Sequence, residues 1–320
     1  MDPATGIGGS SSPAATALLS PRRDRWRRPG GETLQSYAFL APAMLVLVVF
    51  LLGPAIWVFG LSLYHWDLIA ANPDFIGLNN YRILFTHDTT FRKALIQTVY
   101  YVVGTVPTGM ALGLGIALLL NREIRGRGLF RSAIFTPYVM PLVATVIIWS
   151  WILNPDFGIA DAALQALHLP PLDFLRSPRQ VLPSIIVYGL WQHVGYNTVI
   201  FLAGLSNLPP DIDEAARVDG AGTWRRFWMI TWPLLSPTTY FVLLVSMIGS
   251  FKVVSQVLVF VGNGGGPDNS AMTIGLYLYD QAFNSFHAGY AGAISVVLFL
   301  IILAITGLQT GVLSKRVFYR

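Results

Sequence analysis

Cysteine is absent from the 320-residue chain, and charged residues make up only 12% of it. Without cysteine the protein has no disulfide bonds, no thiolate metal ligands and no cysteine nucleophile. A soluble protein of this length would carry roughly a quarter charged residues. The mean hydropathy is +0.57 and 54% of the residues are hydrophobic. This shortage of charge indicates an all-α polytopic membrane protein, because lipid-exposed segments must be helical.

Sequence signatures of catalysis and of nucleotide binding are also missing. No G-x-x-x-x-G-K-[ST] loop occurs, so the chain itself is not expected to bind ATP. The glycine-rich stretch GNGGGP, residues 262–267, lacks the lysine and is expected to form a turn. The five histidines show no metal-ligand spacing, and no G-x-S-x-G elbow is present. We therefore expect neither an enzyme active site nor a metal or cofactor site in this chain.

Six apolar runs are long enough to cross a bilayer, which takes about 20 residues in a helix. Apart from the fifth run, they contain almost no ionisable side chains. The expected spans cover residues 37–63, 95–120, 130–153, 183–205, 232–261 and 289–313.

Lysine and arginine are distributed unevenly about these spans. Fifteen of the 21 lie in the N-terminal tail, the 2–3 loop, the 4–5 loop and the C-terminus, five lie in the other loops, and Lys252 lies inside the fifth span. By the positive-inside rule, both termini and the 4–5 loop are expected to be cytoplasmic. Residues 1–35 are expected to form a disordered basic tail near anionic lipid, with no nucleic-acid partner. Residues 36–320 would then form the transmembrane domain.

The N-terminal segment PRRDRWRR and the apolar run after it also resemble a twin-arginine or secretory signal. The apolar run is too long for such a signal, and no small-residue cleavage site follows it. A retained first span is therefore favoured.

A charged, helix-prone stretch, DEAARVDGAGTWRRFW at 213–228, separates the fourth and fifth apolar runs. Pro209 and Pro210 are expected to end the fourth span, and Asp211 to cap a short helix. Gly220 is placed to end that helix in a left-handed turn.

The short helix expected at 211–220 has a face of small side chains. Ile212, Ala215 and Ala216 fall at i, i+3 and i+4 and so share that face, where another backbone can approach closely. Thr223 is expected to cap a second helix. A helix lying on the lipid surface is the alternative, but it would offer bulky apolar groups and a basic polar face. Alanines and acids favour a protein partner.

The chain resembles the permease subunits of binding-protein-dependent ABC importers. Their cytoplasmic motif reads EAA, three residues, Gly, nine residues, Ile-x-Leu-Pro, and this chain has EAA at 214–216, Gly220 and ITWP at 230–233. Trp232 stands where the family pattern has leucine. The stretches FIGLNNYRILF and GNGGGPDNSAMTIGLYLYDQAF resemble the carbohydrate-uptake subfamily, in particular its maltose-permease F-type member.

This resemblance implies a type I importer permease fold with six transmembrane helices in a bacterial cytoplasmic membrane. Residues 211–220 would be the coupling helix that docks on an ATPase. The implied partners are a second permease, a homodimer of the ATPase, which would hold ATP and Mg²⁺, and an extracytoplasmic solute-binding protein. The residues expected to mediate coupling are Glu214, Ala215, Ala216, Asp219 and Gly220.

Polar and aromatic side chains within two spans are the candidates for the substrate pathway. Trp191, Gln192 and Asn197 lie in the fourth span. The two amides either face a solute or form interhelical hydrogen bonds, and the tryptophan either stacks on a sugar or belongs to the interfacial aromatic belt.

The fifth span contributes Lys252, Ser255 and Gln256, which would share one helix face at i, i+3 and i+4. The lysine either contacts a solute hydroxyl or phosphate, or makes a structural contact with the second permease.

The sequence thus predicts the permease subunit of an ATP-driven importer for sugars or glycerophosphate-type polyols, working by alternating access. A stand-alone secondary transporter of similar solutes is the alternative, but it would need coupling carboxylates within the spans, and none lies deep in them. A membrane-embedded enzyme would need clustered acids or histidines at one membrane face, and these are absent.

Overall fold

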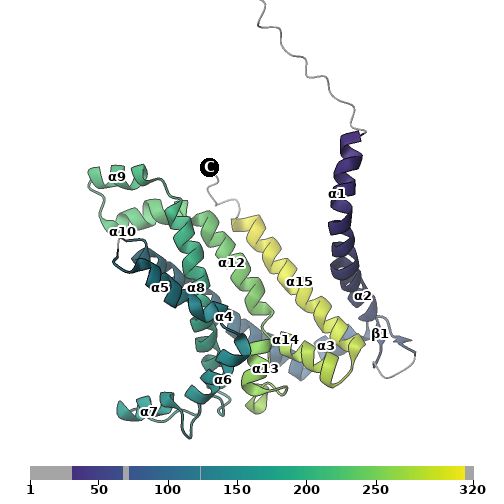
Figure 1. The fold of residues 1–320 in the computed structure, drawn as a ribbon. Helices are drawn as coiled ribbons and strands as arrows, with labels where there is room; N and C mark the ends of the chain where they lie inside the picture. Colours follow the sequence, from purple (N-terminus) through teal and green to yellow (C-terminus); the bar gives the residue numbers. More distant parts are fainter. Residues whose placement is uncertain (1–30, 68–71, 123, 314–320) are drawn as a thin grey trace, which may run out of the picture. The chain divides into compact units, whose positions relative to one another are not determined.

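The computed structural model describes residues 31–67, 72–122 and 124–313 (Figure 1). Within these residues the chain is helical apart from its turns and one short antiparallel pair, β1 (Tyr64–His65) and β2 (Asp74–Phe75). The chain divides into two compact units, Met1–Pro54 and Ala55–Arg320. Most of the expected basic tail, and the basic residues after 313, lie outside the described residues. The first helix already begins at Gly31.

The first helix changes its hydrogen-bonding pattern next to a proline. α1 (Gly31–Leu47) continues through a π-helical turn, η2 (Val48–Leu52), into α2 (Gly53–Leu61). The amide of Gly53 donates to the carbonyl of Val48, five residues back, and Pro54 has no amide to donate. The wide turn accommodates this missing donor.

The second unit holds the remaining helices. In chain order these are α3 (Asn79–Thr86), α4 (Thr89–Leu120), α5 (Arg127–Val139), α6 (Leu142–Ile152), α7 (Ile159–Ala166), α8 (Val181–Ser206), α9 (Pro210–Val218), α10 (Thr223–Arg226), η3 (Phe227–Thr231), α11 (Trp232–Leu234), α12 (Ser236–Phe251), α13 (Ser255–Val261), η4 (Pro267–Asn269), α14 (Ile274–Tyr279), η5 (Asp280–Asn284) and α15 (Ala288–Leu313). α9 and α10 lie at one end of this unit, and α7 and α13 lie at the opposite end (Figure 1).

Glycines allow α8 to approach its neighbours closely. α8 packs most extensively against α4 and then against α5. A Cβ on Gly113 of α4 would come within 2.7 Å of Asn197 Cβ, and one on Gly195 of α8 within 2.0 Å of the Ile134 carbonyl oxygen. Small residues at helix contacts are the usual means of association in a bilayer, where lipid is as apolar as the side chains.

The helix expected at 130–153 is sharply bent. α5 and α6 meet at an angle of 96°. Met140, which precedes Pro141, adopts an extended conformation, because the proline ring excludes the α conformation from the residue before it. The span expected at 130–153 is therefore made of two helices.

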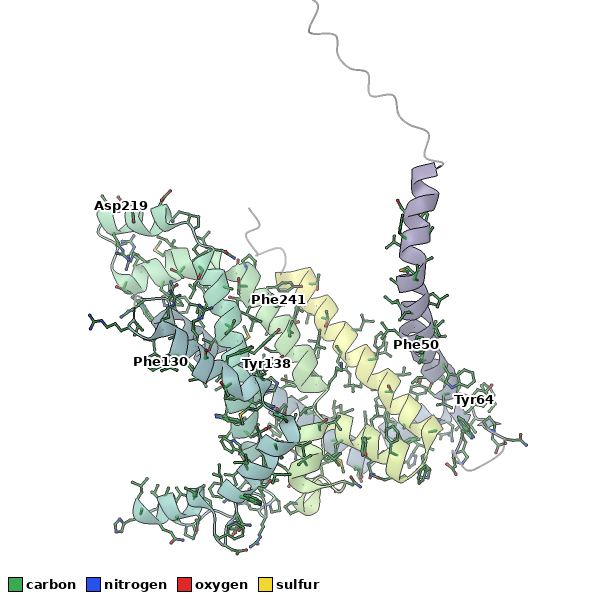
Figure 2. All side chains as sticks on the ribbon, viewed as in Figure 1. Phe50, Tyr64, Phe130, Tyr138, Asp219 and Phe241 are labelled. Carbon is green, nitrogen blue, oxygen red and sulfur yellow. The ribbon has the colours of Figure 1, made fainter. Side chains whose placement is uncertain are left out.

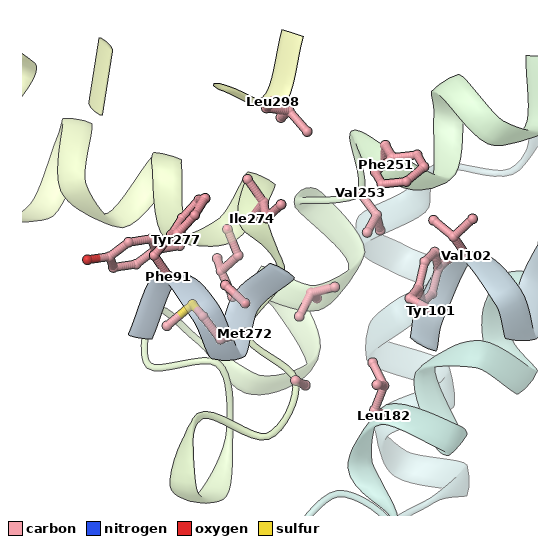
Figure 3. Packing of buried hydrophobic residues seen from close by; sticks show 14 of the residues in the cluster. Phe91, Tyr101, Val102, Leu182, Phe251, Val253, Met272, Ile274, Tyr277 and Leu298 are labelled. Carbon is pink, nitrogen blue, oxygen red and sulfur yellow. The ribbon is translucent and has the colours of Figure 1, made fainter. Parts of the chain in front are cut away.

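The helix expected at 232–261 is also not continuous. Its start, Thr223–Leu234, meets α12 at an angle of 67°. α12 ends at Phe251, and a new helix, α13, begins at Ser255. The break lies in the main hydrophobic cluster, to which Tyr101, Phe251 and Val253 contribute (Figure 3).

One threonine satisfies a backbone carbonyl at this break, and a second satisfies the first amide of α14. Thr273 Oγ1 donates to the Val253 carbonyl at 2.9 Å, and Thr98 Oγ1 accepts from the Ile274 amide at 2.9 Å. Non-helical backbone at membrane depth requires such partners.

Three described helices are long and apolar enough to cross a membrane, or up to five if each bent pair counts as one span. The single helices cover Ser36–Leu61, Thr89–Leu120 and Ala288–Gly311. α8 has the extent expected for the fourth span, but it is not among them because polar residues such as Gln192, His193 and Asn197 lower its hydropathy.

Asp88 connects three helices at one point. Its carboxylate caps α4 by accepting from the Phe91 amide at 2.8 Å, and it also accepts from the hydroxyls of Tyr277, at 2.6 Å, and Tyr290. These two tyrosines lie on α14 and α15, so one side chain ties both helices to the start of α4.

Replacing Gly113 with alanine is expected to destabilise the protein by about 1–3 kcal/mol, because the added methyl group overpacks the contact between α4 and α8. Gly115 is the matched control, since a Cβ there meets nothing within 4 Å. Unfolding midpoints in detergent measure the difference. Equal midpoints for the two variants would show that the helix contact tolerates expansion.

Replacing Asp88 with alanine is expected to cost about 2–4 kcal/mol, from the lost helix cap and two unpaired tyrosine hydroxyls. Asp74→Ala removes an exposed carboxylate from β2 and is expected to change stability by less than about 0.5 kcal/mol. Denaturant titration in detergent compares the two. An Asp88→Ala protein as stable as the control would contradict the assigned role.

Candidate functional site

α9 is a short helix fixed at both ends. Its N-cap is Pro209 and Pro210 is its first residue, so the expectation that Asp211 would be the cap was wrong. Gly220 has φ +74°, and the Ala221 amide donates to the Ala216 carbonyl at 2.9 Å. This left-handed ending confirms the turn expected at Gly220.

The small-residue face of α9 packs partly against the chain itself. Ala216 is only 7% exposed and Ile212 is half-buried, whereas Glu214, Ala215, Asp219 and Gly220 are exposed. Four of the five residues expected in coupling are therefore accessible, and Ala216 anchors the helix. Asp219 follows the end of α9, at the opposite end of the unit from α7 (Figure 2).

The segment after α9 is stiffened by aromatic rings. Gly222, not Thr223, caps α10. Trp228 lies between Trp224 and Trp232, with ring centroids 5.7 and 5.9 Å away. Trp232, the departure from the family motif, thus belongs to an aromatic cluster that connects α10 to α11.

A cavity of about 340 Å³ lies beside the break between α12 and α13. It brings together five of the six residues expected in a substrate pathway: Gln192, Asn197, Lys252, Ser255 and Gln256. Tyr138, which also lines it, lies near the bend between α5 and α6 (Figure 2). The sixth residue, Trp191, does not line the cavity and packs instead against Trp149, at 5.4 Å between ring centroids.

The three residues from the fifth span reach the cavity for a different reason from the one expected. Lys252 follows the last residue of α12, and the backbone leaves the helix at Val254 before α13 begins at Ser255. The three residues therefore do not share a helix face. They line the same cavity because the chain leaves the helix between Lys252 and Ser255. Gln256 is 4% exposed, and its Nε2 donates to the Tyr101 hydroxyl.

Two polar groups that line the cavity lack partners within the described chain. Lys252 is exposed and makes no hydrogen bond or ion pair there. Gln192 is 5% exposed, and its Oε1 atom is buried without a hydrogen-bond partner. No aspartate or glutamate is among the residues that line this cavity.

Other lining residues were not among the candidates for the substrate pathway. Tyr138 and Tyr196 stack at 4.7 Å between ring centroids, and Ser250 Oγ lies 3.3 Å from Thr105 Oγ1. Tyr196 falls one helical turn from Gln192, so the spacing on α8 was the signal that could have found it. Nothing in the sequence places the residues of α4 and α5 opposite them.

A larger, mainly apolar groove of about 1590 Å³ lies along α4, α8 and α12 and reaches α10 and α11. It shares Val106 with the smaller cavity. Arg122, Arg217 and Arg226 are among its lining residues. Within the described residues, no group of three His, Asp or Glu side chains could hold a metal ion.

Comparisons with known proteins agree on one family. The family model described as "Binding-protein-dependent transport system inner membrane component" matches residues 109–319. The sn-glycerol-3-phosphate transport system permease of Agrobacterium fabrum is 31% identical, with 88% of this chain and 96% of the relative covered.

Two further relatives have names that refer to sugars. The multiple sugar-binding transport system permease of Streptococcus mutans is 34% identical, with 88% of this chain and 95% of the relative covered. The trehalose/maltose transport system permease of Thermococcus litoralis is 30% identical, with 86% and 92% covered.

Solved structures of a bacterial alginate ABC transporter have the same fold. One chain matches with a TM-score of 0.74 at 21% identity, covering 89% of this chain and 96% of that chain. A chain from the transporter in complex with an alginate-bound periplasmic protein matches with a TM-score of 0.76, covering 88% and 94%.

The family match, the relatives and the shared fold confirm the resemblance seen in the sequence. The chain belongs to the inner-membrane components of binding-protein-dependent transport systems: it is a multi-pass permease subunit of an ABC importer, whose ATPase is a separate subunit.

Proposed function

We propose that this permease imports a carbohydrate or a polyol phosphate by alternating access, together with a second, different permease. An ATPase dimer, holding ATP and Mg²⁺, would bind α9, and an extracytoplasmic binding protein would deliver the solute at the opposite end. The proposal rests above all on the exposed surface of α9, which presents Glu214 and Ala215 on a helix held in place by Ala216 and by the turn at Gly220.

The solute class is proposed from the relatives and from the cavity. The relatives are named for transport of sugars or of sn-glycerol 3-phosphate. The cavity offers amides, hydroxyls and aromatic rings, which suit a polyhydroxylated solute. The lack of a lining carboxylate disfavours a secondary transporter coupled to protons, because such coupling uses acidic side chains within the membrane.

Six spans with both termini in the cytoplasm remain the proposed topology. Two bent pairs and α8 supply the three spans that are not single apolar helices. One set of arginines follows α8: Arg217, Arg225 and Arg226. A second set lies between α4 and α5 or within α5: Arg122, Arg125, Arg127 and Arg131. The positive-inside rule assigns both sets to the cytoplasm.

The apolar groove along α4, α8 and α12 is the surface proposed for the second permease. Most of its lining side chains are apolar, and several are small or β-branched. In lipid, helices associate through close packing and not through hydrophobicity alone, so a grooved surface of this kind suits another set of helices.

The loop between α6 and α8 is proposed to take part in docking the binding protein. Asp161 is buried and accepts from Gln165 Nε2 at 2.8 Å and from the Leu172 amide at 3.3 Å. Arg176 donates to Asp156, and this hydrogen bond, with the nearby positive charge, lowers the pKa of the Asp156 carboxyl below its ordinary value. Such contacts give the loop a defined shape before docking, which reduces the entropic cost of binding.

Replacing Gly220 with valine is expected to abolish ATPase binding, because a β-branched residue resists positive φ and the turn that orients α9 is lost. Glu214→Arg is expected to weaken the same association through charge reversal. Co-purification of the ATPase with the tagged permease, followed by its ATP hydrolysis, measures both effects.

Gly262 provides a matched control for the glycine variant. It also has positive φ, +70°, and open space around its Cβ position, but it follows α13 at the other end of the unit. Gly262→Val is expected to retain the bound ATPase. If Gly220→Val retained it equally well, α9 would not be the coupling element.

A further inference from the structure

We infer that the cavity beside the break between α12 and α13 selects a polyhydroxylated organic anion, and that Lys252 binds its carboxylate, phosphate or sulfonate group. This inference rests on the proposed function, since it names the solute that the importer moves. Two independent observations carry it: the unpaired ammonium group and the composition of the surrounding wall.

Lys252 has no counter-charge among the described residues that line the cavity. Its side chain is exposed, lines the cavity, and has no hydrogen bond or ion pair within the described chain. None of the residues lining the cavity is an aspartate or a glutamate. A lysine at membrane depth is costly unless water, a carboxylate or an anionic ligand compensates its charge. An anionic solute supplies that compensation at the point where it is bound.

The other polar side chains that line the cavity suit the uncharged hydroxyl groups of a solute. The Gln192 Oε1 atom is buried without a partner, so a hydroxyl donor reaching it would satisfy an otherwise costly group. Asn197, Ser246 and Ser255 also line the cavity. The solute is therefore expected to carry several hydroxyls as well as its charge.

The cavity also provides an aromatic surface of suitable size. Tyr138 and Tyr196 stack with an interplanar angle of 23° and present ring faces or edges to the C–H groups of a polyol. A volume of about 340 Å³ lies at the lower end of the range for small-molecule sites. A small sugar acid, sugar phosphate or polyol phosphate fits this size better than a polysaccharide.

The competing assignment is an ion pair between Lys252 and an acid of the second permease, in a cavity that binds neutral sugars. The two assignments predict opposite solute preferences. They also predict different effects on assembly, because only an ion pair between the subunits would make the complex depend on Lys252.

The first measurement identifies the solute, using the purified binding protein of this importer. Thermal shifts are recorded with matched anionic and neutral compounds: D-glucuronate and D-glucose, sn-glycerol 3-phosphate and glycerol, and sulfoquinovose with D-glucose. We expect stabilisation by one anionic member and not by its neutral partner, and the pair that responds distinguishes carboxylate, phosphate and sulfonate. Stabilisation by neutral compounds alone would overturn the inference.

The second measurement is ATP-dependent uptake of the stabilising solute by the complete importer in proteoliposomes. Lys252→Gln is expected to raise the KM for the anionic solute by at least about tenfold, whereas Lys252→Arg keeps the charge and is expected to restore most of the affinity. Lys93→Gln is the matched control, because Lys93 lies at the surface and pairs with Asp268.

Three results would contradict the inference. These are unchanged anion uptake in Lys252→Gln, an equal effect of Lys93→Gln, or loss of the second permease from Lys252→Gln complexes. In each case ATP-driven transport by the wild-type protein would leave the proposed function intact. A wild-type complex that takes up no solute would reject the proposed function, and the inference with it.

Discussion

Backbone hydrogen bonding is the constraint on which the rest of this permease depends. In lipid an unpaired amide or carbonyl costs several kcal/mol, so a helix that stops within the membrane needs new partners for the groups it releases. Beyond the end of α12, Thr273 donates to the Val253 carbonyl, and Thr98 accepts from the Ile274 amide at the start of α14. The first contact gives the non-helical stretch from Lys252 to Val254 a hydrogen-bond partner, and the second connects α14 to α4.

The break places polar chemistry inside an otherwise apolar unit. Because the chain leaves the helix there, Lys252 and Ser255 both line one cavity with Gln192 and Asn197 of α8. Gln256, which also lines the cavity, donates to the hydroxyl of Tyr101 on α4. A continuous helix would have kept its backbone groups paired and left less room between α8 and α12. The cavity thus depends on the same irregularity that the threonines stabilise.

The exposed helix α9 and this cavity are connected by one continuous segment. This segment begins at Gly220, runs through α10, the aromatic cluster around Trp228 and the bend before α12, and reaches the cavity at Lys252. Movement of α9 with a bound ATPase would therefore reach the cavity through packed rings and two helices. Such a rigid path with hinge points at its bends is typical of elements that change between two arrangements.

The sequence by itself determined the membrane class, the family and the left-handed turn at Gly220, because hydropathy, motif spacing and glycine can be read locally. Tertiary structure alone decided that α12 stops at Phe251, since the break that follows, Lys252–Val254, contains no proline or glycine. It also decided that Ala216 is buried and that Trp191 lies outside the cavity. These features depend on side chains from distant helices. The spacing of residues within one segment does not tell which distant side chain will pair with a backbone group where a helix stops.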